Sequence, residues 1–161
     1  CVRRHDVFER CAHRGERLEL RVLVARGRVA LGGGRLRDQL GLEPRVLGLE
    51  VVSATKERIE ARMLVRPDLC NPVAGLHGGA TMSIADTLGA MGASMNLPEG
   101  ANGTTTLESK TNFIGVAKSG ETVVAVCTPL HIGRRTSIWQ TKITTEAGKT
   151  VALVTQTQMV L

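Results

Sequence analysis

Residues 78–95 carry the one long helical pattern in this sequence, and the segments around it have the pattern of strands. Apolar Met82, Ala85, Leu88 and Met91 recur there at helical spacing. The second half of the segment is crowded with small residues, namely Gly89, Ala90, Gly92, Ala93 and Ser94. Each glycine weakens a helix by about 1 kcal/mol relative to alanine. We therefore expect a sheet to wrap around this helix and pack closely against its backbone.

Six strand-like segments flank the helix, two before it and four after it. They span residues 45–54, 57–65, 103–113, 122–130, 136–145 and 149–160. The second of them alternates strictly, with Ile59, Ala61, Met63 and Val65 sharing one face. Between this strand and the helix, two prolines and a glycine predict a loop over residues 67–76. This element order predicts an α+β domain with one mainly antiparallel sheet around a single central helix.

The basic charge of the chain is concentrated at its N-terminal end. The net charge is +6, and residues 1–45 hold 11 Arg, no Lys and six acidic residues. Residues 1–34 show no clean period and end in three glycines, which form a flexible joint. A short helix, a strand added to a sheet edge or disorder would each fit this segment. We expect a loosely ordered extension over residues 1–34, a helical turn over residues 35–41 and the folded domain over residues 35–161.

Composition excludes several classes of protein. Aromatic residues make up 2% of the chain, too few to stack the bases of a single-stranded nucleic acid. No run of about 18 consecutive apolar residues occurs, which argues against a membrane-spanning helix, and no signal peptide opens the sequence. The four cysteines have wide and irregular spacing, which predicts free thiols and no zinc site. We expect a cytoplasmic protein with no metal, no nucleic-acid partner and no membrane contact.

The segment that enters the helix has features of a catalytic loop. His77, Gly78 and Gly79 stand where the loop turns into the helix, and glycine lets a substrate approach the backbone closely. The first N–H groups of a helix have no internal partner, so with the helix dipole they can bind a developing oxyanion. A plain loop-to-helix turn would use the same three residues. Asp86 is the only acidic residue of the helical segment, and such an acid must be exposed, paired or functional.

The spacing between the candidate donor and the candidate acid has a consequence for assembly. Gly78 and Asp86 are eight residues apart, which is about 12 Å along a helix. This distance is too long for both groups of one chain to reach a single carbonyl group. If both act on one bond, Gly78 of one subunit meets Asp86 of another across antiparallel helices. The sequence therefore predicts a dimer with two sites.

Several residues together form a family signature. They are Asn71, the run Leu76-His77-Gly78-Gly79, Asp86, the pair Thr104-Thr105 and the run from Cys127 to Arg135. In these features the chain, from about residue 48 to its C-terminus, resembles the hotdog-fold acyl-CoA thioesterases of the 4-hydroxybenzoyl-CoA thioesterase and phenylacetate-degradation (PaaI-like) type. The resemblance implies an antiparallel sheet wrapped around one central helix, and a homodimer that shares the sheet or a dimer of such dimers. It also implies an acyl-CoA substrate and no separate cofactor.

The resemblance assigns roles to the residues of the loop and the helix. The Gly78 N–H would polarise the thioester carbonyl, and Asp86 would act as nucleophile or as the general base that activates water. Asn71 would help to position the water or the carboxylate. His77 would fix the loop or touch the thioester, and Gly79 would line the substrate loop.

Later residues complete the implied site. Thr104 or Thr105 falls where some family members use a hydroxyl to orient water. Arg134 and Arg135 would meet the phosphates of coenzyme A, although a solvated turn would contain the same residues. The run from Cys127 to Arg135 looks like the branch that acts on aroyl-CoA esters, which often carries Glu where this chain has Asp86. Aryl and medium-chain acyl groups are therefore both open.

Two other functions fit parts of the sequence. Hotdog hydratases need an Asp and a His around an Asn-Pro pair, and no His stands at that spacing from Asn71-Pro72. A non-catalytic acyl-CoA-binding regulator could use the basic N-terminal segment to contact DNA. That segment lacks the apolar spacing of a helix-turn-helix, and a regulator has no need of Asp86 and Asn71. We expect an acyl-CoA thioesterase.

Overall fold

The computed structural model describes residues 46–161 and, before them, the backbone of three short strands. These strands are β1 (Leu23–Ala25), β2 (Arg28–Leu31) and β3 (Gly34–Arg35), and they form a small antiparallel sheet. The helical turn expected over residues 35–41 lies outside the described residues beyond Arg35. Apart from the three strands, the same is true of the extension expected over residues 1–34.

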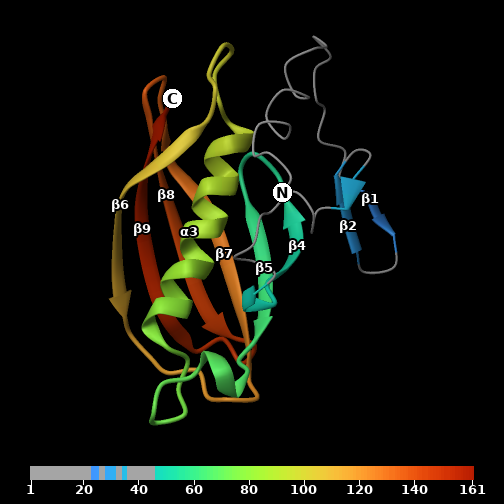
Figure 1. The fold of residues 1–161 in the computed structure, drawn as a ribbon, viewed down its shortest axis with the longest axis vertical. Coiled ribbons are helices and arrows are strands. Elements are labelled where there is room, and N and C mark those ends of the chain that lie inside the picture. Colours follow the sequence, from blue (N-terminus) through green and yellow to red (C-terminus); the bar gives the residue numbers. More distant parts are fainter. Residues whose placement is uncertain (1–22, 26–27, 32–33, 36–45) are drawn as a thin grey trace, which may run out of the picture.

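The main body of the structure is a six-stranded antiparallel sheet with one long helix on its face (Figure 1). The strands are β4 (Glu50–Ala54), β5 (Ile59–Leu64), β6 (Thr104–Phe113), β7 (Thr122–Ile132), β8 (Thr136–Thr145) and β9 (Thr150–Val160). They lie in the order β4-β5-β7-β8-β9-β6, so β6 is at one edge. Helix α3 (Gly78–Met95) contacts β6, β7, β8 and β9. This is the hotdog arrangement, and it confirms the predicted fold class and element order.

The glycines of α3 are the points where the sheet touches the helix backbone. A Cβ atom on Gly92 would lie 2.6 Å from Cζ3 of Trp139, whose side chain on β8 is fully buried. A Cβ atom on Gly89 would lie 2.5 Å from Oε1 of Gln156 on β9. Both separations are far below a normal contact, so any side chain at either position would force the neighbouring group to shift. The small residues of the helix therefore have the role that the sequence predicted for them.

The buried stripe of α3 differs in part from the predicted one. Met82 is 39% exposed and Met91 is half-buried, whereas Ala85 and Leu88 are fully buried as expected. The buried helix residues are Thr81, Ile84, Ala85, Leu88, Gly89, Gly92 and Ala93. The reason is that glycines share the inner face of the helix with apolar side chains. A prediction from apolar side chains alone therefore places the buried stripe one position away from where it lies.

The alternation predicted for the second strand is confirmed. Ile59, Ala61 and Val65 have no exposed surface and Met63 has 2%, so all four face the helix side of the sheet. The strand is slightly shorter than predicted, and the loop that follows it contains a single 3-10 turn, η2 (Pro67–Leu69). The core thus lies between β5, the central strands and α3.

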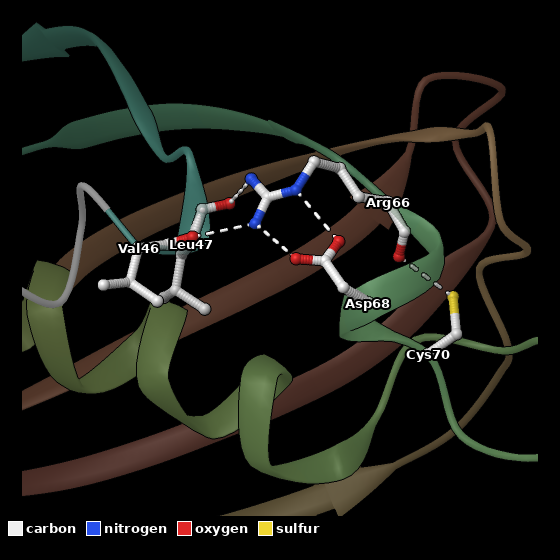
Figure 2. A network of polar contacts seen from close by, with 5 residues as sticks. All are labelled: Val46, Leu47, Arg66, Asp68 and Cys70. Atoms are coloured by element: carbon white, nitrogen blue, oxygen red, sulfur yellow. Dashed lines mark hydrogen bonds and ion pairs between the residues drawn. The ribbon is translucent and has the colours of Figure 1, made fainter.

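The first predicted strand begins later than expected, because Arg66 holds the chain in another conformation. Val46 and Leu47 are helical, and Gly48 has φ +71°. The Arg66 guanidinium donates to the carbonyl oxygens of Val46 at 2.8 Å and Leu47 at 3.0 Å (Figure 2). It also donates to both carboxylate oxygens of Asp68, at 3.0 and 3.1 Å, and these hydrogen bonds lower the pKa of Asp68. Residues 46–49 are therefore not part of the strand.

Candidate active site

Asn71 organises the loop that precedes α3. Its side-chain Oδ1 accepts hydrogen bonds from the backbone N–H groups of Val73 and Gly75, each at 3.1 Å. Its own N–H donates to the Gly75 carbonyl at 2.8 Å, and Ala74 takes a φ of 59° in the resulting turn. The Asn71 oxygen is thus committed to the loop. Its amide nitrogen is the group that is left to bind water or a substrate oxygen.

The N-terminal end of α3 presents backbone donors. His77 is the N-cap, and its Nδ1 accepts a hydrogen bond from the Gly79 N–H at 3.0 Å. In a neutral ring this places the hydrogen on Nε2, on the exposed side chain. The Gly78 N–H makes no backbone hydrogen bond among the described residues, as expected at the first position of a helix. Gly79 is occupied by the cap, so Gly78 holds the donor that can meet an oxyanion.

The Asp86 carboxylate lies in a polar cluster between α3 and the sheet edge. Its Oδ1 accepts a hydrogen bond from the Thr106 hydroxyl on β6 at 2.9 Å and another from Nε2 of Gln156 on β9. Its Oδ2 has no hydrogen-bond partner in the described part of the chain. The acid is half-buried and is held by one oxygen, which leaves the other oxygen available for chemistry.

The hydroxyl that contacts Asp86 belongs to Thr106, which is not among the residues predicted from the sequence. Thr104 lies on the same face two residues earlier, and its hydroxyl donates to the Met159 carbonyl at 2.9 Å. Thr105 is exposed, because side chains alternate along β6. Residues 104–106 are all threonines, so which of them contacts Asp86 depends on the register of the strand. No signal in the sequence predicts that register. Gln156 was also missed, since nothing in a strand of alternating Thr and Gln marks it.

Arg134 and Arg135 lie far from the N-terminal end of α3. Both are exposed in the turn between β7 and β8, and the Arg135 carbonyl accepts from Val160 N–H at 2.9 Å. That turn lies beside the C-terminus, at the end of the molecule opposite to the N-terminal end of α3 (Figure 1). No ion pair holds either side chain among the described residues. Within one chain these arginines therefore do not meet the loop that carries His77 and Gly78.

Other chemistry-bearing groups lie outside this site. Burial raises the pKa of the Cys127 thiol to about 11, so this group is an inert part of the core. Cys70 and Cys127 form no disulfide. No cluster of His, Cys, Asp or Glu in the described residues could hold a metal ion. None of the helices in the same part of the chain has the length and hydropathy needed to cross a membrane.

The predicted donor, Gly78, and the predicted acid, Asp86, lie at different positions along the axis of α3. Gly78 lies beside Phe113 at the end of β6, where a Cβ atom on Gly78 would be 3.1 Å from the ring Cζ. Asp86 lies beside Thr106, near the start of β6. The structure therefore separates the donor and the acid along both α3 and β6. A single chain does not bring them together.

Comparison with known proteins identifies the fold family. Residues 75–152 match the model of the thioesterase superfamily. The proofreading thioesterase EntH of Cronobacter turicensis is 33% identical over 103 residues, which are 64% of this chain and 74% of that protein. The 1,4-dihydroxy-2-naphthoyl-CoA hydrolase of Escherichia coli is 36% identical over 93 residues, 58% of this chain and 67% of that protein.

A solved structure agrees with these relatives. The crystal structure of a thioesterase from Haemophilus influenzae superposes with a TM-score of 0.68 at 32% sequence identity. The alignment covers 73% of this chain and 81% of that chain. The residues that match the family model include His77, Gly78 and Asp86. The chain therefore belongs to the thioesterase superfamily of hotdog-fold thioester hydrolases.

Proposed function

We propose that this protein hydrolyses acyl-CoA thioesters to the free acid and coenzyme A. The observation that carries the proposal is that one helix presents two groups that are free to meet a substrate, the Gly78 N–H and Oδ2 of Asp86. The thioester carbonyl oxygen binds at the Gly78 N–H, which stabilises the oxyanion as it develops. Asp86 either removes a proton from the attacking water or attacks the carbonyl carbon itself. The C–S bond then breaks, and the coenzyme A thiolate leaves and takes up a proton. If Asp86 is the base, the free acid forms in this step; if Asp86 is the nucleophile, the acyl group is left on Asp86 as an anhydride, which a water molecule hydrolyses to the free acid and the Asp86 carboxylate.

The site is completed by a second copy of the chain. Strand β6 is at the sheet edge, and Leu107 and Phe113 are 55% and 58% exposed along it. A long unpaired edge strand is a template for pairing with another chain. Antiparallel pairing of two β6 strands, centred between Ser109 and Lys110, puts Phe113 of one copy opposite Thr106 of the other. Each dimer then has two sites in which Gly78 of one copy faces Asp86 of the other.

The same pairing gives roles to the remaining residues. The Asn71 amide nitrogen and the His77 Nε2 lie on the loop that meets the substrate. The turn that holds Arg134 and Arg135 is at the C-terminal end of its own α3, so antiparallel pairing moves it toward the partner's helix N-terminus. Two exposed arginines there suit the phosphates of coenzyme A. No metal and no separate cofactor takes part, because the donor and the acid are both protein groups.

The acyl group is of the aryl or medium-chain class. Two of the relatives are named for an aroyl-CoA hydrolase activity and for a proofreading thioesterase activity. A cytoplasmic location belongs to this proposal and is supported by the two unpaired thiols, Cys70 and Cys127. A non-catalytic regulator that binds acyl-CoA is the competing function.

The test is thiol release from a panel of benzoyl, hydroxybenzoyl, phenylacetyl, hexanoyl and palmitoyl esters of coenzyme A. We expect the wild-type protein to hydrolyse at least one ester, and Asp86→Asn to lower kcat by about 10²- to 10⁴-fold because it removes the base or nucleophile. Glu146→Gln is the matched control, since Glu146 forms only an exposed ion pair with Arg62 at 3.4 Å. Near-full activity of Asp86→Asn would refute the mechanism. If the folded wild-type protein hydrolyses none of these esters, the result would favour the non-catalytic regulator.

A further inference from the structure

Strand β9 carries two glutamines that are almost completely buried. Gln156 and Gln158 each have 1% exposed surface, and both face the helix side of the sheet because they are two residues apart. A buried amide is destabilising unless it is hydrogen-bonded. The partners of these two side chains therefore indicate what the structure gains from them.

Both glutamines are connected to Asp86 by hydrogen bonds. Gln156 Nε2 donates directly to Asp86 Oδ1. Gln158 Nε2 donates to the Thr106 hydroxyl at 2.8 Å, and that hydroxyl donates to Asp86 Oδ1 at 2.9 Å. Because a hydroxyl has a single hydrogen, a donor from Gln158 forces the Thr106 hydrogen toward the carboxylate. Two donors thus converge on one oxygen of Asp86.

The second amide lies between two threonines of β6. Its Oε1 lies 3.3 Å from the Thr104 hydroxyl oxygen, whose hydrogen is shared with the Met159 carbonyl at 2.9 Å, and its Nε2 faces the Thr106 hydroxyl. The two side chains and the two threonines form one hydrogen-bonded row across β6 and β9. The row ends at Asp86 and leaves the Asp86 Oδ2 atom outside it.

The hydrogen bond from Gln156 to Asp86 leaves the other end of the Gln156 amide without a partner. With Nε2 turned toward Asp86, its Oε1 points at the backbone of α3 and has no hydrogen-bond partner in the described structure. A buried acceptor without a partner destabilises the folded state. An apolar side chain would avoid this loss, so stability alone does not explain a glutamine here.

Gly89 is the position that makes room for this arrangement. It lies on α3 three residues after Asp86, and a Cβ atom there would be 2.5 Å from Gln156 Oε1 and 3.0 Å from its Cδ. Any side chain at residue 89 would push the amide away from the helix, and with it the donor on Asp86.

We propose that Gln156 is a positioning residue for the reaction and that Gly89 is its required partner on the helix. Gln156 holds Asp86 Oδ1 so that Oδ2 is aimed at the attacking water or the thioester carbonyl carbon. This inference rests on the proposed thioesterase function of Asp86. It concerns how the acid is aimed, and it assigns no contact between Gln156 and the substrate.

The test is a double-mutant cycle in the full chain, with Gln156→Met as the variant that keeps length and removes the donor. Hydrogen bonds to charged groups are worth about 1.5–3 kcal/mol, so we expect kcat to fall about tenfold to a hundredfold with KM nearly unchanged. In the Asp86→Asn background the same substitution should change the residual rate by less than about twofold, because the group to be aimed is gone. Gln140→Met, at a glutamine on the opposite face of β8, is the matched control and should leave kcat unchanged.

Gly89→Ala tests the inference without touching Gln156 itself. It should lower kcat in the same direction as Gln156→Met, and the two substitutions combined should be less than additive. Unchanged kcat in a folded Gln156→Met protein would overturn the inference, and so would equal losses with and without Asp86. These outcomes are distinct from failure of the proposed function, in which the wild-type protein or Asp86→Asn would already give the contrary result.

Discussion

The two ends of the candidate catalytic stretch of α3, residues 77–79 and Asp86, present their polar groups in different ways. At residues 77–79 the helix offers backbone N–H groups, an exposed imidazole and almost no side-chain support. At Asp86, eight residues further on, a single carboxylate oxygen is held by Thr106 and Gln156 from two strands. One region binds through the geometry of the helix itself, whereas the other depends on side chains that the sheet supplies.

This difference shows where sequence changes can be tolerated. A helix N-terminus keeps its free N–H groups with any residue except proline, so Gly78 matters for access and for its hydrogen. The environment of Asp86 needs four specific polar side chains and one glycine in register. The first region is set by local chain conformation, and the second by the pairing of β6 with β9.

The largest effect expected in the first region comes from Gly78→Pro. Proline suits the first position of a helix, and His77 already has the extended conformation that proline requires before it, with ψ 140°. The substitution therefore removes the N–H while it keeps the helix. Loss of one oxyanion donor lowers kcat by about 10²- to 10³-fold, which thiol release will measure.

Gly78→Ala is the control for this prediction. It adds the same Cβ atom beside Phe113, at 3.1 Å from the ring, and keeps the N–H. We expect it to retain most of the activity, because the Phe113 ring has to move by only a few tenths of an ångström. Equal losses in the two variants would mean that space at residue 78, and not its hydrogen, limits the reaction.

A smaller effect separates packing from positioning within the second region. Gly92→Ala places a Cβ atom 2.6 Å from the buried Trp139 ring, which Ser137 holds through a 2.9 Å hydrogen bond. Overpacking of this kind costs about 1–3 kcal/mol, and the gain in helix propensity offsets about 1 kcal/mol of it. Chemical denaturation should show a lower free energy of unfolding, while kcat per folded molecule stays unchanged. A loss of kcat similar to that of Gly89→Ala would remove the distinction between the two glycines.

The sequence was sufficient to predict the fold because its information is local and periodic. The alternation from Ile59 to Val65 and the limits of α3 follow from side-chain spacing, and both are confirmed. The predicted start of β4 was wrong because Arg66, nearly twenty residues away, donates hydrogen bonds to the carbonyl oxygens of residues 46 and 47. No local pattern contains that contact.

The candidate site could be predicted only where a motif marks it. His77, Gly78 and Asp86 stand out in the sequence by residue type and position. Thr106 and Gln156 do not, since their contact with Asp86 depends on a register shift in the β6–β9 pair between Thr106 and Glu108. The strand register decides that Thr106, and not Thr104 or Thr105, reaches Asp86, and this register is visible only in the folded chain.

The central claim is that one site takes its donor from one copy and its acid from another. The most direct test mixes inactive Gly78→Pro with inactive Asp86→Asn under conditions in which mass spectrometry verifies subunit exchange. In a mixed dimer one site then has both an intact Gly78 and an intact Asp86, so an equal mixture should recover about a quarter of the wild-type activity. No recovery in verified mixed dimers would contradict the account, because it would mean that each chain supplies both groups to its own site.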